Sequence, residues 1–329
     1  MSESPTVASP GKAGSDAGAG FEQPFPGGHL LGLKGLGRQS IIRVLDLADS
    51  YADSDHREAR FAERLRGRTL VNLFYENSTR TLASFELAGK RLGMDVVSLA
   101  TSTSSVQKGE TLIDTARTLD AMGVDAIVIR HSEKDAPREI SGQVRAAVIN
   151  AGDGSNEHPT QSLLDALTMR RAKGGLGGLS VAICGDLAHS RVARSNFHLL
   201  GTMGAKVRAV APTAFLPADI GDFDLSHFED MDEGIAGVDV VMMLRVQKER
   251  LGGADLPADY IDNYGLTMAR LRRAAPDAVV MHPGPMNRGI EIASEVADHP
   301  TRSLIFTQVK MGVAVRMAVL DLCCGSADG

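Results

Sequence analysis

The chain has 329 residues, of which 43% are hydrophobic, and its formal net charge is −6. This length predicts two domains of roughly 150 residues, each able to bury a core. The acidic balance, without a long basic block, argues against nucleic acid as the main partner. No apolar run reaches the roughly 18–20 residues of a membrane span, and no signal-peptide pattern opens the chain. Cys184, Cys323 and Cys324 have neither disulfide nor zinc spacing, so we expect a cytoplasmic protein that needs no metal and no cofactor.

Residues 1–30 are rich in Gly, Ala, Ser and Pro and show no periodicity, so we expect a disordered N-terminal extension. A helix is predicted over residues 39–65, where apolar side chains recur on one face. From residue 69 the chain alternates between strands and helices, a pattern typical of parallel sheets covered on both faces. The predicted strands are residues 69–74, 95–99, 126–129, 147–150, 179–184, 205–211, 238–243 and 278–281.

The glycine-rich segment 174–178 indicates a flexible joint between two halves of the chain. We expect an α/β protein with two doubly wound parallel-sheet domains, residues 31–165 and 166–303, and an active site in the cleft between them. The last segment, 304–329, contains a predicted helix over 304–323 that is long enough to cross back to the first domain.

The stretch 70–81 predicts a buried strand that leads directly into an amphipathic helix. Ser78, Thr79, Arg80 and Thr81 fall in the first helical turn, where free backbone N–H groups and the positive end of the helix dipole favour anions. Together they predict a receptor for a phosphate group. The alternative is an ordinary Ser or Thr N-cap beside a solvated arginine, and for the three residues 78–80 alone the odds are about even.

Other predicted strands also end in cations, histidines or amides. In open parallel sheets such carboxyl ends gather at one edge, so these side chains predict a cleft that binds anions. The chain has no P-loop and no nucleophile elbow, which leaves a reaction that relies on positioning and electrostatics. The residues are Ser104 to Lys108, Arg130, His158, Gln161, Arg191, Arg245, Gln247 and His282.

Five motifs carry a resemblance to a known family. They are F-Y-E-N-S-T-R-T at 74–81, S-S-V-Q-K-G-E-T at 104–111, H-P-T-Q at 158–161, L-R-V-Q-K-E-R at 244–250 and H-P-G-P-M-N-R at 282–288. Over residues 32–322 the chain resembles the catalytic chains of aspartate carbamoyltransferases, in the aspartate/ornithine carbamoyltransferase superfamily. The resemblance implies transfer of the carbamoyl group from carbamoyl phosphate to the amine of L-aspartate, an early step of pyrimidine synthesis.

The resemblance also implies a role for each matching residue in binding carbamoyl phosphate. Ser78, Thr79, Arg80 and Thr81 would hold the phosphate. Arg130 and His158, with Thr81, would polarise the carbamoyl carbonyl. The carbamoyl NH₂ would donate to Gln161 and to backbone carbonyls near Gly284 and Pro285.

For L-aspartate, the resemblance implies two carboxylates held by Arg191 and Arg245 with Gln247. Ser104 and Lys108 would come from a neighbouring subunit, with Lys108 also reaching aspartate, so the working unit would be a homotrimer. Glu76 would pair with Arg191 and Arg250 when the two domains close.

Three alternatives remain open from the sequence. An ornithine carbamoyltransferase shares the phosphate motifs, but Pro283 replaces a cysteine of that relative, and Arg245 would repel an amine-bearing side chain. A non-catalytic scaffold subunit of the same fold is the second alternative. The third concerns assembly: the variant residues 284–288 resemble chains that assemble with dihydroorotase or its inactive relatives, and a regulatory subunit is equally open.

Overall fold

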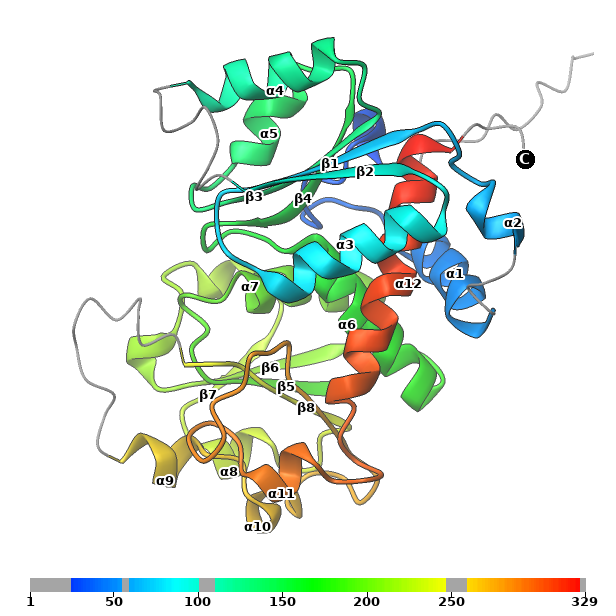
Figure 1. Cartoon of the computed structure of the whole chain (residues 1–329). Coiled ribbons are helices and arrows are strands. Elements are labelled where there is room, and N and C mark those ends of the chain that lie inside the picture. The colour runs from blue at the N-terminus through cyan, green and yellow to red at the C-terminus, as the bar shows by residue number, and fades with distance from the viewer. Residues whose placement is uncertain (1–24, 55–58, 101–109, 247–258, 326–329) are drawn as a thin grey trace, which may run out of the picture.

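The computed structural model describes residues 25–54, 59–100, 110–246 and 259–325. It has two α/β lobes, one above the other in Figure 1. The first lobe has a four-stranded parallel sheet in the order β2-β1-β3-β4. Nearly every side chain of the strands 69–74 and 147–153 is buried, as expected when helices cover both faces. The strands are β1 (Thr69–Phe74), β2 (Asp95–Ala100), β3 (Ala126–His131) and β4 (Ala147–Asp153).

The helices of this half of the chain connect successive strands or precede them. They are α1 (Arg38–Asp53), α2 (Ala59–Ala62), α3 (Thr79–Arg91), α4 (Leu112–Ala121), α5 (Ala136–Ser141) and α6 (Pro159–Lys173).

The second lobe has a five-stranded parallel sheet in the order β7-β6-β5-β8-β9. Its strands are β5 (Ser180–Cys184), β6 (Lys206–Val210), β7 (Ser226–Phe228), β8 (Val240–Met243) and β9 (Val279–Met281). Its helices are α7 (Arg191–Met203), α8 (Met231–Gly234), α9 (Tyr260–Tyr264), α10 (Met268–Leu271) and α11 (Ser294–Ala297).

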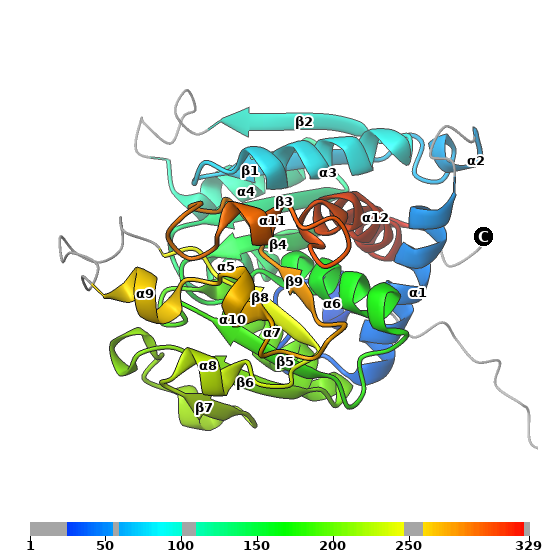
Figure 2. The same ribbon diagram turned by 90° about the horizontal axis from the view of Figure 1, so that it is seen from below.

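The last helix, α12 (Ile305–Cys324), joins the lobes. In Figure 1 it starts beside the second lobe and ends beside the first. It packs on α1, α3 and α6, and the view from below in Figure 2 shows it between α3 and α1. Near its C-terminal end, Asp321 accepts hydrogen bonds from Tyr51 and Arg64, both at 2.7 Å.

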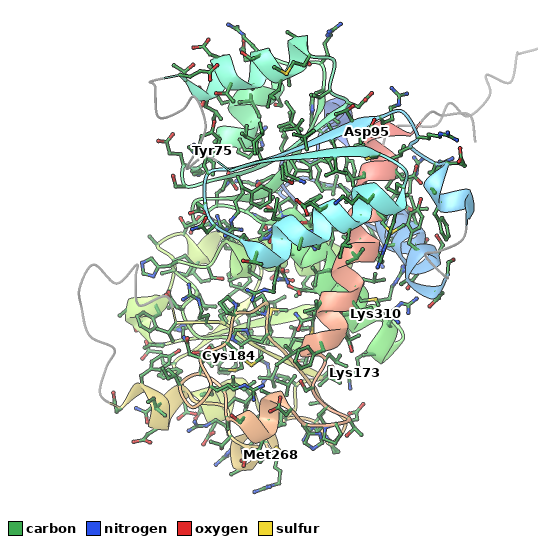
Figure 3. All side chains as sticks on the ribbon, viewed as in Figure 1. Tyr75, Asp95, Lys173, Cys184, Met268 and Lys310 are labelled. Carbon is green, nitrogen blue, oxygen red and sulfur yellow. The ribbon has the colours of Figure 1, made fainter. Side chains whose placement is uncertain are left out.

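The direction of the strands decides where a site can form. Figure 3 labels Tyr75, just beyond the end of β1, and Asp95, at the start of β2, on opposite sides of the upper sheet. Because all strands of one sheet are parallel, their carboxyl ends share one edge, which is where open α/β sheets bind ligands.

The predicted fold class is confirmed, including the return of the last helix to the first lobe. Three local predictions were wrong. Residues 25–30 are not a disordered extension, since Phe25 and Leu30 are buried and Leu30 pairs with Ile149 of β4. The helix over 39–65 is interrupted, because α1 ends at Asp53 and α2 starts at Ala59. The short strand β7 was missed.

Within the residues that the structure describes, no helix is both long enough and apolar enough to cross a membrane.

Candidate active site

A cleft of about 440 Å³ lies where the two lobes meet. The first lobe contributes the turn between β1 and α3, with Ser78, Thr79, Arg80 and Thr81 all lining the cleft. Ser78 occupies the N-cap position of α3, but its hydroxyl donates to Thr81 Oγ1 at 3.0 Å and caps no backbone N–H. The first N–H groups of α3 are therefore left to interact with a ligand.

Two more helices begin at the same cleft. His158 precedes α6, and Ser190 precedes α7. Each helix directs the positive end of its dipole toward the cavity, and three such ends together favour an anion there.

The side chains that line the cleft make it strongly cationic. None of the described residues that line it is acidic. Burial and the nearby Arg245 guanidinium lower the pKa of Arg80, which means that the two cations are close enough to repel each other. An anion bound between them would relieve this repulsion. The five arginines that line the cleft are Arg80, Arg130, Arg191, Arg245 and Arg316.

Two glycines make room for this crowding of guanidinium groups. A Cβ on Gly152, in β4, would lie 3.0 Å from Arg191 Cζ and 3.1 Å from Arg130 Nη1. A Cβ on Gly284 would lie 3.2 Å from Arg80 Cζ. Both glycines have positive φ, 118° and 68°, so other residues would be strained there even without the arginines.

Glu76 connects the lobes beside the cleft. Its Oε2 lies 2.8 Å from Arg191 Nη2 and 3.4 Å from Arg130 Nε. Arg191 Nη1 also donates to the carbonyl of Gly154 at 3.2 Å. One carboxylate oxygen of Glu76 therefore contacts an arginine from each lobe.

His158 lines the cleft and is buried. Burial, with Arg130, Arg191 and Arg316 nearby, lowers the pKa of His158 well below its ordinary value. The imidazole is therefore neutral at pH 7 and can donate one N–H. Its Nδ1 is buried without a hydrogen-bond partner among the described residues.

The cleft also contains a small set of hydrogen-bond acceptors. Gln161 lines it and donates through Nε2 to Asp165 at 3.0 Å. The loop after β9 also brings Gly284 and Pro285 into the lining of the cleft, with a cis peptide bond between them.

Sequence reasoning missed Arg316 of α12, which is 3% exposed and lines the cleft. Burial lowers its pKa to about 10, and its guanidinium lies over the Phe85 ring at 5.1 Å. An arginine inside the apolar run of residues 311–320 was the signal that could have revealed it. Gln308 of the same helix and His189 before α7 line the cleft and were also missed.

Ser104, Lys108, Gln247 and Arg250 lie outside the described residues. Within the described part of the chain, no group of three or more His, Cys, Asp or Glu side chains could hold a metal ion.

Comparisons with known proteins give the two halves of the chain a common assignment. Residues 28–171 match the carbamoyl-P binding domain of aspartate/ornithine carbamoyltransferases, and residues 177–323 match the Asp/Orn binding domain of the same family. The aspartate carbamoyltransferase catalytic subunit of Parvibaculum lavamentivorans is 59% identical over 90% of this chain and 91% of its own length. That of Granulibacter bethesdensis is 58% identical over 89% of this chain and 93% of its own.

Solved structures agree with the sequence relatives. Aspartate transcarbamoylase of Trypanosoma cruzi in complex with N-(phosphonacetyl)-L-aspartic acid superposes with a TM-score of 0.83 and 34% identity, over 91% of this chain and 97% of that one. Its ligand-free form superposes with a TM-score of 0.74 and 32% identity, over 89% of this chain and 95% of that one. With both halves matched by family and by structure, the chain belongs to the aspartate/ornithine carbamoyltransferase family.

Proposed function

We propose that this chain transfers the carbamoyl group of carbamoyl phosphate to the amine of L-aspartate, giving N-carbamoyl-L-aspartate and phosphate for pyrimidine synthesis. The observation that carries the proposal is the cleft between the lobes. It combines three helix N-termini, five arginines and no described acidic lining residue, which suits a phosphate next to a dicarboxylate. Two relatives that are 59% and 58% identical to this chain bear the name of this activity.

The phosphate would bind at the start of α3, to Ser78, Thr79, Arg80 and Thr81. This position uses the uncapped N–H groups of the helix together with hydroxyls and a guanidinium, all of which donate to phosphate oxygens. The dianion bound to Arg80 also offsets the repulsion that Arg80 experiences from Arg245.

The carbamoyl carbonyl would point toward Arg130, His158 and Thr81. The aspartate amine attacks the carbonyl carbon, the oxygen becomes an oxyanion, and donors already in place stabilise it. The neutral state of His158 suits this role because an imidazole N–H can donate without being a strong acid. The carbon–oxygen bond to phosphate then breaks, and the departing phosphate takes the amine proton.

The two aspartate carboxylates would bind to Arg191 and Arg245, assisted by Gln247 and Lys108. A guanidinium can hold a carboxylate through two parallel hydrogen bonds, which favours a dicarboxylate over ornithine. Glu76 and Arg250 would hold the lobes closed around it. The higher similarity to the bisubstrate-analogue complex than to the ligand-free relative supports a closed arrangement.

The working unit would be a homotrimer in the cytoplasm, in which Ser104 and Lys108 complete a neighbour's site. The exposed apolar side chains of Leu87 in α3 and Val97 in the edge strand β2 support an interface on this side of the first lobe. A larger assembly with dihydroorotase or a regulatory subunit remains compatible with this arrangement.

The test is direct. The purified chain, given labelled carbamoyl phosphate, should form labelled N-carbamoyl-L-aspartate with aspartate and far less product with ornithine. Faster carbamoylation of ornithine would refute the substrate assignment. No turnover with either amino acid, from a folded chain, would support the scaffold alternative.

A further inference from the structure

Asp165 is a fully buried carboxylate one turn after Gln161 in α6. It accepts three amide N–H groups from three helices. Gln161 Nε2 and Gln308 Nε2 donate to its Oδ1 at 3.0 and 2.8 Å, and Asn196 Nδ2 donates to its Oδ2 at 3.0 Å. Three donors around one carboxyl group favour the ionised form, which accepts on both oxygens and donates nothing.

The protonation state is consistent with this geometry at neutral pH. Burial raises the pKa of Asp165 to about 6, and the three amides and the positive charge of Arg316 counteract the burial. α12 presents Arg316 and Gln308 to the carboxylate, and α7 presents the uncharged Asn196. At pH 7 the group is therefore mainly an anion.

This anion decides which way the Gln161 amide faces. A primary amide has its NH₂ and its oxygen on opposite sides, so when Nε2 is bound to Asp165 the oxygen Oε1 is left for the cleft that Gln161 lines. Rotating the amide would place two acceptors, Oε1 and a carboxylate, against each other. The cleft is otherwise dominated by cations and hydroxyls, so a fixed acceptor there suits an N–H of the ligand.

A second series of hydrogen bonds leads from the same carboxylate to the loop after β9, which also lines the cleft. Gln308, held through its Nε2, accepts the backbone N–H of His282 on Oε1 at 2.9 Å. His282 accepts the N–H of Gly284 on Nδ1 at 2.9 Å, and its Nε2 lies 3.2 Å from Glu291 Oε1. Asp165 thus orients both Gln161 and the loop 282–285, whose carbonyls are the other proposed acceptors.

We propose that Asp165 is the positioning residue for recognition of the substrate's NH₂ group, acting through the amide of Gln161. The inference rests on the proposed function and deepens it. Through Gln161, Asp165 would make the site prefer a carbamoyl group, which carries NH₂, over an acyl group that carries a methyl in the same place. A site whose buried acceptors face a methyl group leaves them unpaired, which disfavours the wrong ligand.

The experiment compares carbamoyl phosphate with acetyl phosphate, which replaces the NH₂ by CH₃ and keeps the phosphate and carbonyl. The readout is the ratio of the inhibition constant of acetyl phosphate to the KM of carbamoyl phosphate. In Asp165→Leu, which fills a similar volume but accepts nothing, this ratio should fall roughly tenfold or more. In a Gln161→Met background the same substitution should cause no further fall, because its effect passes through Gln161.

Asp321→Leu is the matched control, since Asp321 is a buried carboxylate at the far end of α12 that also accepts two hydrogen bonds. It should lower stability and leave the ratio unchanged. If Asp165→Leu does not fold, Asp165→Asn replaces it, with an expected fall of about threefold because one amide oxygen cannot satisfy all three donors.

An unchanged ratio in a folded Asp165 variant would overturn the inference. So would a fall of equal size in the Gln161→Met background. Either result leaves the proposed function intact as long as the unaltered chain makes N-carbamoyl-L-aspartate. Absence of that product in the unaltered chain would instead refute the proposed function.

Discussion

At the scale of single residues, the proposed role of Arg245 concerns only one of the two substrates. Its guanidinium approaches Arg80 from the second lobe, yet the proposed mechanism gives it an aspartate carboxylate and not the phosphate. Arg245→Ala should raise the KM of aspartate by about 30- to 1000-fold, the loss expected for one charge-assisted bidentate contact. The KM of carbamoyl phosphate should stay nearly unchanged, as steady-state kinetics with each substrate varied would show.

Arg208→Ala is the control for this prediction. Arg208 bonds backbone carbonyls of the second lobe, Gly234 and Ala236, away from the cleft. It should alter stability without changing either KM. An equal loss of affinity for both substrates in Arg245→Ala would mean that Arg245 binds the phosphate as well.

His158 predicts a pH effect on stability. Its pKa is lowered in the folded chain, so on acidification the unfolded chain takes up this proton first, at about pH 6.5. The folded form therefore loses stability as the pH falls below about 6.5, by up to roughly 1.4 kcal/mol per pH unit. Urea unfolding should show that the free energy of unfolding falls more between pH 8 and pH 5.5 for the unaltered chain than for His158→Asn. Parallel losses in the two proteins would contradict a neutral, buried His158.

The residues that the sequence could and could not reveal differ in a physical way. Ser78 to Thr81 were found because hydroxyls and an arginine at a strand-to-helix junction have a chemical meaning in local sequence. Arg316 and Gln308 were not found, because the sequence of their helix is largely apolar and the helix reaches the cleft only through tertiary packing. Gly152 gave no signal either, since its importance lies in two guanidinium groups from elsewhere in the chain.

At the scale of elements, the loop after β9 must leave space for Arg80. Gly284→Ala should displace the Arg80 guanidinium, since the new Cβ would lie 3.2 Å from Cζ at a φ of 68°. We expect the affinity for carbamoyl phosphate to fall about tenfold or more, because Arg80 would lose its proposed charge-assisted contact with the phosphate. Protection of the enzyme against thermal unfolding by the substrate provides the measurement.

Gly289→Ala in the same loop is a matched control. Gly289 also has positive φ, 79°, but a Cβ there would meet no atom within 4 Å. Both variants should lose about 1 kcal/mol of stability from backbone strain, and only Gly284→Ala should lose affinity. A similar loss of affinity in both would show that strain of the loop, and not the space for Arg80, is responsible.

Strand and helix positions followed from the sequence where one face or one run was clearly apolar. β1 was predicted at its observed bounds because four of the five residues 70–74 are apolar, with Asn72 as the exception. β7 was missed because three residues, two of them exposed, carry no periodicity. The helix over 39–65 was predicted too long because apolar residues return at Ala59, Phe61 and Leu65. The polar stretch 53–58 separates them from α1, which ends where Ser54 is extended.

At the scale of the whole molecule, Glu76 couples the two lobes. Glu76→Ala should lower kcat and raise the KM of aspartate together, since closure both completes the site and excludes water. Melting should change little, because the contact is partly exposed and forms at the edge of the cleft. Small-angle scattering should show less compaction on adding a bisubstrate analogue.

Asp219→Ala controls for the loss of an ion pair as such. Asp219 pairs with Arg194 at 2.6 Å within the second lobe, so its removal should affect stability and leave kinetics alone. If Glu76→Ala behaved in the same way, Glu76 would be a helix-capping or stabilising residue with no part in closure.

The proposed trimer makes a prediction of its own. If Lys108 completes a neighbour's site, Lys108→Ala and Arg80→Ala chains should each be inactive, and mixed trimers should regain activity at interfaces that combine two intact halves. An activity assay after confirmed subunit exchange gives the answer. Persistent inactivity of the mixture would mean that each chain carries its complete site.

The return of α12 to the first lobe has a consequence for biosynthesis. α12 is translated after both lobes, yet it covers apolar faces of α1 and α3, and Tyr51 bonds to Asp321, 270 positions later. The N-terminal half of the nascent chain therefore leaves the ribosome with part of its core open to water. Chains terminated before Ile305 keep that surface exposed, which makes incomplete translation products targets for chaperones and proteases.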